Sequence, residues 1–184
     1  MADKKDYEAL FREMHPGFFE KEHIRSIKEE WICEEMILRL DEFDPHAYEK
    51  TFDSSVSFGF FRSSLDELHA SVEQVVPSWL PLYTEKSRVY CGFMDGKIAS
   101  FCMIENMGEH LLDGQTLKIG GPGCVGTVPD YRNKGIGLMM VRDVTSILKE
   151  EGYDLGYSHY TGVAPWYGKL GSKTVLKWNR HGIL

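Results

Sequence analysis

One stretch in the second half of the chain restricts the fold more than any other, because it combines a strand, a tight turn and a helix start. It covers residues 125–138 and has the sequence Val-Gly-Thr-Val-Pro-Asp-Tyr-Arg-Asn-Lys-Gly-Ile-Gly-Leu. Apolar residues then recur every three or four positions as far as Leu148, which predicts an amphipathic helix. Gly152 is expected to follow the last turn as the C′ residue.

The start of this helix has the features of an anion site. The first N–H groups of a helix have no partner within it, and the helix dipole adds partial positive charge there. Gly135 and Gly137 let a ligand approach the backbone, and Arg132 and Lys134 add formal charge. A P-loop would place Lys and Ser or Thr after the glycines, and a dinucleotide fingerprint would need glycine at Met140. A phosphate or pyrophosphate site of another kind is therefore predicted.

Length and composition favour one soluble domain with an extension. The chain has 184 residues, of which 42% are hydrophobic, so it can bury a substantial core. No apolar run approaches the roughly 20 residues of a membrane span, and residues 1–6 lack the apolar segment of a signal peptide. We therefore expect a cytoplasmic protein with no membrane partner.

Charge and residue spacing argue against two further classes of partner. The net charge is −7 and no basic run stands out, so nucleic acid is not expected. The four cysteines show no Cys-x-x-Cys spacing and the seven histidines form no short pair, so we expect no metal site. The cysteines are interpreted as reduced, mostly buried residues.

Turn signals and periodicity predict the remaining elements. Residues 1–34 are expected to form a helical N-terminal extension, with a second helix within 18–31, and residues 35–184 the main domain. Strands are expected at 35–40, 89–94, 97–104, 116–119, 124–128, 154–160 and 175–178, and helices at 65–76 and 164–171. Asp95-Gly96 predicts a type I′ hairpin turn, and Ser64 to Glu67 a capping box. The segment 120–123, Gly-Gly-Pro-Gly, predicts a bulge or a backbone left open to a ligand. This order predicts an α/β fold with a mixed, mostly antiparallel central sheet flanked by helices.

Two motifs resemble the GCN5-related N-acetyltransferase (GNAT) family. The Arg-x-x-Gly-x-Gly pattern after a strand and a Val-Pro turn resembles the family's acyl-coenzyme A loop. The segment Trp166-Tyr167-Gly168-Lys169-Leu170-Gly171 resembles its Tyr-x-x-Leu-Gly segment. The resemblance covers residues 35–180 in element order and is specific over 125–171. It implies the GNAT fold, with acetyl-coenzyme A (acetyl-CoA) as acyl donor.

The resemblance also implies roles for individual residues. The backbone of Val125, Gly126 and Thr127 would pair with the pantetheine arm, and Arg132 would shape the loop. The loop amides that would hold the pyrophosphate belong to Asn133, Lys134, Gly135, Ile136, Gly137 and Leu138. Tyr167 would protonate the leaving thiolate, which is feasible because phenol and thiol pKa values are about 10 and 8.5.

Three features depart from the family pattern. Ser172 stands where an aromatic residue usually follows Leu-Gly, and Tyr160 stands where an Asn often precedes the tyrosine. The tail after Gly171 is short for a final two-strand hairpin, so the last strand is expected to be missing or supplied by a partner. An incomplete sheet edge would favour a homodimer.

The expected reaction is acetyl transfer to a primary amine, which attacks the thioester directly in a ternary complex. A backbone N–H of Thr127 or Val128 is expected to polarise the carbonyl oxygen, and Glu105 or His159 to accept the amine proton. A covalent route through Cys124 is disfavoured because no His or Asp stands at motif spacing. The aromatic-rich residues 46–62 and Trp79 favour a small-molecule acceptor.

Two alternatives stay open from the sequence. A CoA-binding regulatory or interaction module without turnover would account for Ser172, Tyr160 and the short tail, and the chain could instead be one half of a tandem transferase. Turnover of an amine by a protein that binds CoA would separate an enzyme from a binding module.

Overall fold

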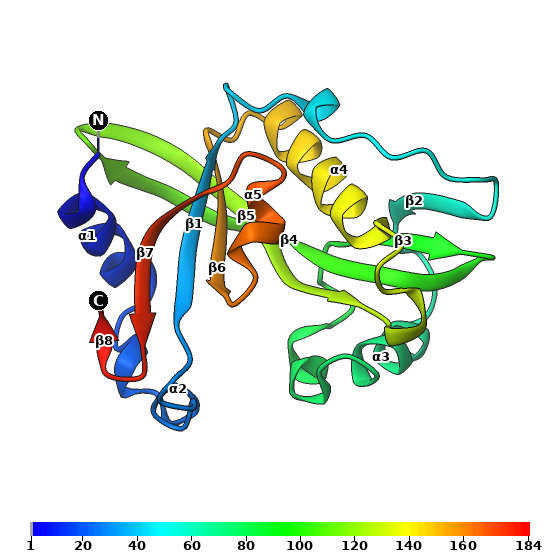
Figure 1. Ribbon diagram of the computed structural model, residues 1–184, viewed down its shortest axis with the longest axis horizontal. Coiled ribbons are helices and arrows are strands. Elements are labelled where there is room, and N and C mark those ends of the chain that lie inside the picture. The colour runs from blue at the N-terminus through cyan, green and yellow to red at the C-terminus, as the bar shows by residue number, and fades with distance from the viewer. Residues whose placement is uncertain (1) are drawn as a thin grey trace. The chain divides into compact units, whose positions relative to one another are not determined.

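The computed structural model describes residues 2–184, and Figure 1 labels its main helices and strands. The helices are α1 (Lys4–Met14), α2 (Glu22–Arg25), α3 (Leu65–Glu73), α4 (Ile136–Glu150) and α5 (Ala164–Gly168), with 3-10 turns η1 (Phe18–Glu20), η2 (Pro45–Ala47), η3 (Pro77–Leu82) and η4 (Pro129–Tyr131). The strands are β1 (Cys33–Arg39), β2 (Val56–Phe60), β3 (Val89–Met94), β4 (Lys97–Leu112), β5 (Gln115–Thr127), β6 (Leu155–Thr161), β7 (Lys173–Asn179) and β8 (Gly182–Ile183). Within this described part, no helix has the length and apolarity that crossing a membrane requires.

Hydrogen bonds arrange the eight strands in the order β2-β3-β4-β5-β6-β1-β7-β8. The pairs β2–β3, β3–β4, β1–β6, β1–β7 and β7–β8 are antiparallel, whereas β5 and β6 are parallel. This confirms the predicted α/β fold with a mixed, mostly antiparallel sheet.

The chain divides into two compact units, which are described one at a time. Unit 1 comprises Met1–Phe43, Asn106–Gly120 and Glu151–Leu184, and unit 2 comprises Asp44–Glu105 and Gly121–Glu150. The predicted boundary after residue 34 stays a prediction.

Two tight turns have the backbone geometry that their sequences predict. Asp95 and Gly96 have φ of 52° and 74°, and Asp113 and Gly114 have φ of 50° and 75°. Positive φ at both central residues is the requirement of a type I′ turn, which matches the twist of the strands that it joins. The hairpin prediction at Asp95-Gly96 is therefore confirmed.

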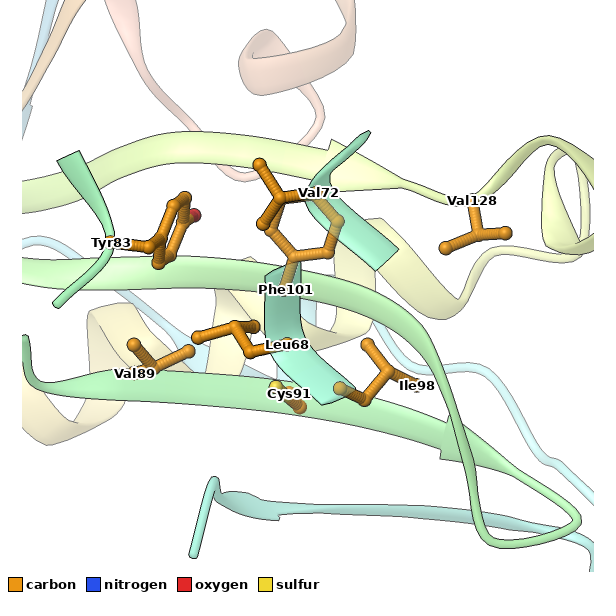
Figure 2. Packing of buried hydrophobic residues seen from close by; sticks show 8 residues of the cluster. All are labelled: Leu68, Val72, Tyr83, Val89, Cys91, Ile98, Phe101 and Val128. Atoms are coloured by element: carbon orange, nitrogen blue, oxygen red, sulfur yellow. The ribbon is translucent and has the colours of Figure 1, made fainter. Parts of the chain in front are cut away.

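The core of unit 2 lies between α3 and the strands β3 and β4. Leu68 and Val72 on α3 pack with Val89 and Cys91 on β3 and with Phe101 on β4, as Figure 2 shows. The helix begins where the sequence predicts, because the Ser64 hydroxyl accepts the Glu67 amide at 3.4 Å. The predicted capping box is only half formed, since the Glu67 carboxylate accepts the Ser63 hydroxyl instead.

Helix α4 covers the face of β3 and β4 that is opposite to α3 (Figure 1). A Cβ at Gly92 of β3 would lie 2.5 Å from Cγ2 of Ile136, the first residue of α4. Cys91, the preceding residue, belongs to the α3 side of the sheet. Gly92 therefore lets the beginning of α4 rest directly on the sheet. Gly152, with φ of 74°, follows the helix as predicted.

Strand β1 lies inside the sheet, a position that the sequence did not predict. It pairs with β6 through Met36 and Ser158 and with β7 through Ile37 and Lys173. The edge beside β3 is taken by β2, in the aromatic-rich stretch where no period predicted a strand. The expectation of a missing last strand was wrong, because the chain itself supplies β1, β7 and the short β8. A homodimer stays a prediction.

The N-terminal helices of unit 1 contribute side chains to its core. Leu10 of α1 packs with Ile37 and Tyr157, while Phe11 packs with Phe18 and Trp178. Leu10 and Phe11 are thus the buried residues of the first helix. The second helix expected within residues 18–31 forms only as the short turns η1 and α2.

Candidate active site

In unit 2, strand β5 bends at the residue before the proposed cofactor segment. Cys124 has φ of 47°, a left-handed conformation that is uncommon for a residue with a side chain. Its carbonyl oxygen accepts the Tyr83 hydroxyl at 2.6 Å, and Tyr83 is buried. This strained residue lies one position beyond 120–123, where the sequence predicted a bulge or a backbone left open to a ligand, which stays a prediction. Tyr83 holds this backbone in place.

Two glycines of β5, which lack side chains, allow its backbone to lie close to side chains of β4. A Cβ at Gly123 would lie 2.3 Å from Cδ of Glu105, and one at Gly126 would lie 2.3 Å from Cζ of Phe101. The Glu105 carboxyl group and the Phe101 ring thus fill the space that a side chain would need. Glu105 lies beside the backbone just before Val125, within the same unit as the predicted cofactor segment.

The turn from β5 to α4 has two left-handed residues. Asn133 has φ of 60° and Gly135 has φ of 83°, and Arg132 Nε donates to the Thr127 carbonyl at 3.1 Å. The first helical hydrogen bond runs from the Met139 amide to the Gly135 carbonyl at 3.1 Å. The preceding amides, Ile136, Gly137 and Leu138, begin the helix and have no partner within it. Residues 132–138, called the glycine loop below, therefore present a row of amides beside fixed positive charge.

A third cation lies at this loop, and sequence spacing did not reveal it. A Cβ at Gly135 would lie 2.6 Å from Cδ and 3.1 Å from Nζ of Lys50. Lys50 also lies over the Phe52 ring at 5.8 Å, and Lys134 lies over the Tyr131 ring at 5.6 Å. Among the described residues, neither lysine nor Arg132 forms an ion pair with a carboxylate. Three uncompensated cations near a helix N-terminus favour an anionic ligand.

Two details of the expected chemistry change in the structure. The Val128 amide donates to the Ala99 carbonyl at 3.0 Å, so it is not open to polarise a thioester, and Thr127 is the remaining candidate. Burial, followed by the charge of Glu105, raises the pKa of Cys124 to about 12. A thiol with that pKa stays protonated at neutral pH, which argues against the covalent route.

The other two predicted catalytic residues lie in unit 1. Tyr167 is on α5, buried, with its ring 4.8 Å from that of Trp166. His159 is near the end of β6, before Tyr160, which has φ of 57°. The predicted site residues are thus divided, with Glu105 and the glycine loop in unit 2 and Tyr167 and His159 in unit 1.

A polar group that no sequence spacing predicted surrounds His159. Glu35 on β1 is fully buried, and its carboxylate accepts His159 Nδ1 at 2.9 Å, the Tyr160 amide at 3.2 Å and Trp178 Nε1 at 2.6 Å. The His15 ring stacks on His159, with centroids 3.9 Å apart and an interplanar angle of 15°. These five residues are called the Glu35 network. They come from the C-cap of α1 and from β1, β6 and β7, so only the folded chain brings them together.

Three members of the network are of types that can bind a metal ion. One potential ligand atom from each of His15, Glu35 and His159 lies within 4.8 Å of the others. Their separation in sequence explains why a search for short pairs did not find them. A nitrogen lone pair lies in the plane of its ring, and stacked rings have parallel planes. The two imidazoles would have to turn before both could point at one ion.

Comparisons with known proteins agree with this fold. A family model described as an acetyltransferase (GNAT) domain matches residues 60–174. A GCN5-related glucosamine N-acetyltransferase region of a fungal multi-domain GH3 beta-N-acetylglucosaminidase is similar, with a TM-score of 0.64, 20% identity, and coverage of 82% of this chain and 20% of that chain. A GCN5-related N-acetyltransferase from Kribbella flavida has a TM-score of 0.55 and 16% identity, covering 80% of this chain and 56% of that one.

A tandem GNAT protein from the clavulanic acid biosynthesis pathway is also similar, with a TM-score of 0.55, 14% identity, and coverage of 80% of this chain and 51% of that one. This chain therefore spans between 20% and 56% of the length of these three chains. No curated protein matches the sequence. The structural matches support the fold, and the family model covers more than half of the chain. The chain belongs to the GNAT acetyltransferase family.

Proposed function

We propose that this protein transfers the acetyl group of acetyl-CoA to a primary amine of a small molecule. The observation that carries the proposal is the glycine loop, where first-turn amides of α4 lie beside Lys50, Lys134 and Arg132. A diphosphate bridging two halves of a cofactor is an anion that suits such a site. The loop amides from Asn133 to Leu138 bind the diphosphate, and the backbone of Val125 to Thr127 pairs with the pantetheine arm.

The same proposal assigns a proton path. The amine nitrogen attacks the thioester carbon, the carbon–sulfur bond breaks, and the Thr127 amide stabilises the negative charge on the carbonyl oxygen. One proton leaves the nitrogen for a base, for which Glu105 and His159 are the candidates. Tyr167 returns a proton to the coenzyme A thiolate.

The acceptor is assigned by chemical class only. The protein is acidic, with a net charge of −7, which favours cationic amines over anionic substrates. Because one similar structure is a glucosamine N-acetyltransferase region, amino sugars belong in the first panel of acceptors, with amino acids and polyamines.

The test is a calorimetric titration of acetyl-CoA into wild type, Gly135→Trp and Gly152→Trp. Both glycines have positive φ, 83° and 74°, so the same substitution strains both backbones. Only Gly135 has Lys50 against it, whereas a Cβ at Gly152 would meet nothing within 4 Å. We expect binding to wild type and Gly152→Trp, and its loss in Gly135→Trp while the variant stays folded by circular dichroism.

The amine panel is then assayed by release of free coenzyme A thiol. Turnover of a primary amine, with acetylated product seen by mass spectrometry, would support the proposal. Binding without turnover of any amine would instead support the regulatory module. No binding of acetyl-CoA to wild type would overturn both assignments.

A further inference from the structure

The buried carboxylate of Glu35, in unit 1, has its two oxygens in different surroundings. Oε1 accepts Trp178 Nε1 at 2.6 Å and the Tyr160 amide at 3.2 Å, and it also lies 3.0 Å from His159 Nδ1. Oε2 lies 2.9 Å from the same Nδ1. Two N–H donors outside the histidines therefore hold Oε1, which makes Oε2 the oxygen better able to bind a cation.

The charge of Glu35 has no permanent partner. Its ion-pair partner in the described part of the chain is His159, which carries charge only when it is protonated. The Glu35 side chain is 0% exposed, and a buried charge is costly unless it is paired. When His159 is neutral, the carboxylate has hydrogen-bond donors but no cation bound to it. A metal ion at Oε2 would supply the missing positive charge.

The ring of His15, which stacks on His159, has an unused polar atom. Within residues 2–184, Nε2 of His15 is buried and has no hydrogen-bond partner. Neutral imidazole has either a hydrogen or a lone pair at this nitrogen, and each normally finds a partner when it is buried. An ion that accepts the lone pair would remove this deficiency.

The three residues have the chemistry and the spacing of a zinc site. Two histidines and one glutamate form the protein ligands of known zinc sites. Atoms bound to a tetrahedral zinc ion at about 2.0–2.1 Å lie about 3.3 Å from one another. Here one potential ligand atom from each residue lies within 4.8 Å of the others, so closure of the site requires approaches of at most about 1.5 Å. His159 Nδ1 and Glu35 Oε2 are already 2.9 Å apart.

The stacked rings must turn to bind, and the structure permits this. His15 is the C-cap residue of α1, so it follows the last helical turn. Its Nε2 has no hydrogen bond that a rotation would break. Nδ1 of His159 exchanges its hydrogen bond to Glu35 for a bond to an ion that Glu35 also binds, and the hydrogen of the neutral ring is then on the other nitrogen. The main loss is the ring stacking at 3.9 Å.

We propose that His15, Glu35 and His159 bind one zinc ion. Nε2 of His15, Oε2 of Glu35 and Nδ1 of His159 are the ligand atoms. The two N–H donors at Oε1 orient the carboxylate from behind, as hydrogen bonds commonly do for carboxylates that bind a metal. Three protein ligands leave a fourth position for water. Imidazole ligands argue against Mg²⁺ and Ca²⁺, which prefer oxygen.

The ion would join three segments of unit 1 that are far apart in the sequence. His15 ends α1, Glu35 is on β1, and His159 is on β6. An ion that binds the folded state and not the unfolded chain raises stability, so zinc should stabilise this unit. The inference does not rest on the proposed function. It bears on it in one respect, because a His159 whose lone pair binds zinc cannot also accept the amine proton.

The first test is a calorimetric titration of the full chain, after a chelator has been applied and dialysed away. Wild type, His15→Phe and Glu35→Gln are each titrated with Zn²⁺, and wild type also with Mg²⁺. We expect one Zn²⁺ per chain in wild type and no binding of Mg²⁺. Each variant should lose more than the about 10- to 100-fold in affinity that the loss of an outer-shell partner costs.

Two control variants identify binding elsewhere on the chain. Glu34→Gln removes one negative charge from the same strand as Glu35. His46→Phe removes a histidine whose Nδ1 lies 2.6 Å from Glu49 Oε1, an exposed pair that could bind zinc without a built site. We expect the affinity of both controls to equal that of wild type. A loss in His46→Phe while His15→Phe binds normally would overturn the proposal, as would the absence of stoichiometric binding to wild type.

The second test is thermal unfolding followed by circular dichroism, with and without saturating Zn²⁺. We expect zinc to raise the Tm of wild type and of both controls, and to leave that of His15→Phe unchanged. Phenylalanine keeps a ring at position 15, so this variant carries the test even if Glu35→Gln does not fold. A Tm of wild type that zinc does not raise, or an equal rise in His15→Phe, would overturn the proposal.

Discussion

The glycine loop and the Glu35 network are both polar sites in one small protein, yet the fold builds them in opposite ways. The loop is a single run of residues that presents backbone amides and exposed cations, with α4 resting on Gly92. The network is assembled from four separate elements around a carboxylate that is 0% exposed. The glycine loop depends on backbone conformation, whereas the Glu35 network depends on side chains that supply hydrogen-bond partners to a buried carboxylate.

The difference explains what each site can tolerate. Backbone donors at a helix start need no particular side chain, only residues that allow the conformation and the approach of a ligand. A buried carboxylate instead needs each of its donors, because losing one partner leaves a charge or a donor unsatisfied. Changes in the network should therefore affect stability first, and changes in the loop should affect binding first.

The largest effect is expected from Glu35→Leu. The substitution leaves Trp178 Nε1, the Tyr160 amide and His159 Nδ1 without their acceptor in a buried site. Removing one partner of a buried charged group typically costs about 3–5 kcal/mol, and we expect that loss in the free energy of unfolding. Urea denaturation at pH 7 measures it, with Glu34→Leu as control. An equal loss in both variants would show that the hydrogen bonds of Glu35 do not contribute specifically to the free energy of unfolding.

The fold was predictable from the sequence where short residue patterns determine the backbone, as in tight turns. It was not predictable where strands far apart in the sequence pair with each other. The turns at Asp95-Gly96 and Asp113-Gly114 require residues that tolerate positive φ, so short sequence patterns identify them. The position of β1 depends on which strands its two edges meet, and no pattern within residues 33–39 contains that information. Strand β2 was missed because partly exposed aromatic residues give no clear alternation there.

A second large effect is expected from the pH dependence of stability. The pKa of His15 is about 4 in the folded protein, below the ordinary value of 6.5. Between these values the unfolded chain binds more protons, so stability falls as the pH decreases from 6.5 to 4. A shift of this size corresponds to at most about 3 kcal/mol.

His15→Phe should remove most of this dependence, because phenylalanine keeps a ring beside His159 and cannot take a proton. The free energy of unfolding would be measured at pH 7 and pH 4.5 for wild type, His15→Phe and His23→Phe. His23 is an exposed histidine on α2, so the control should behave as wild type. An unchanged pH dependence in His15→Phe would show that other groups cause the loss.

A smaller effect is expected where Gly126 of β5 packs against the Phe101 ring. Gly126→Ala would bring a Cβ to 2.3 Å from the Phe101 ring, which is fully buried. Overpacking of this kind typically costs about 1–3 kcal/mol. In a Phe101→Leu background the clashing ring atoms are absent, so the same substitution should cost much less. The double-mutant cycle from urea denaturation gives the coupling energy, and additivity would contradict this packing.

The candidate site was predictable in the same uneven way. The glycine loop could be found because its residues are contiguous and their types are dictated by backbone chemistry. Lys50 precedes the loop by more than eighty positions and Glu35 precedes His159 by 124, so neither contact has a signature in spacing. Both depend on a charged side chain that the sequence alone gave no reason to single out.

The smallest effect expected is that of Lys50→Gln on acetyl-CoA affinity. The ammonium group lies close to Gly135 but is solvent exposed, and exposed ion pairs are typically worth about 0.2–1 kcal/mol. We therefore expect an affinity loss of about fivefold or less, measured by calorimetry at low salt, with Lys86→Gln as an exposed control in the same unit. The loss should shrink at high ionic strength, where exposed charges are screened. A loss that is independent of salt would mean that the Lys50 stem supports the glycine loop by packing, and that its charge does not contribute to binding.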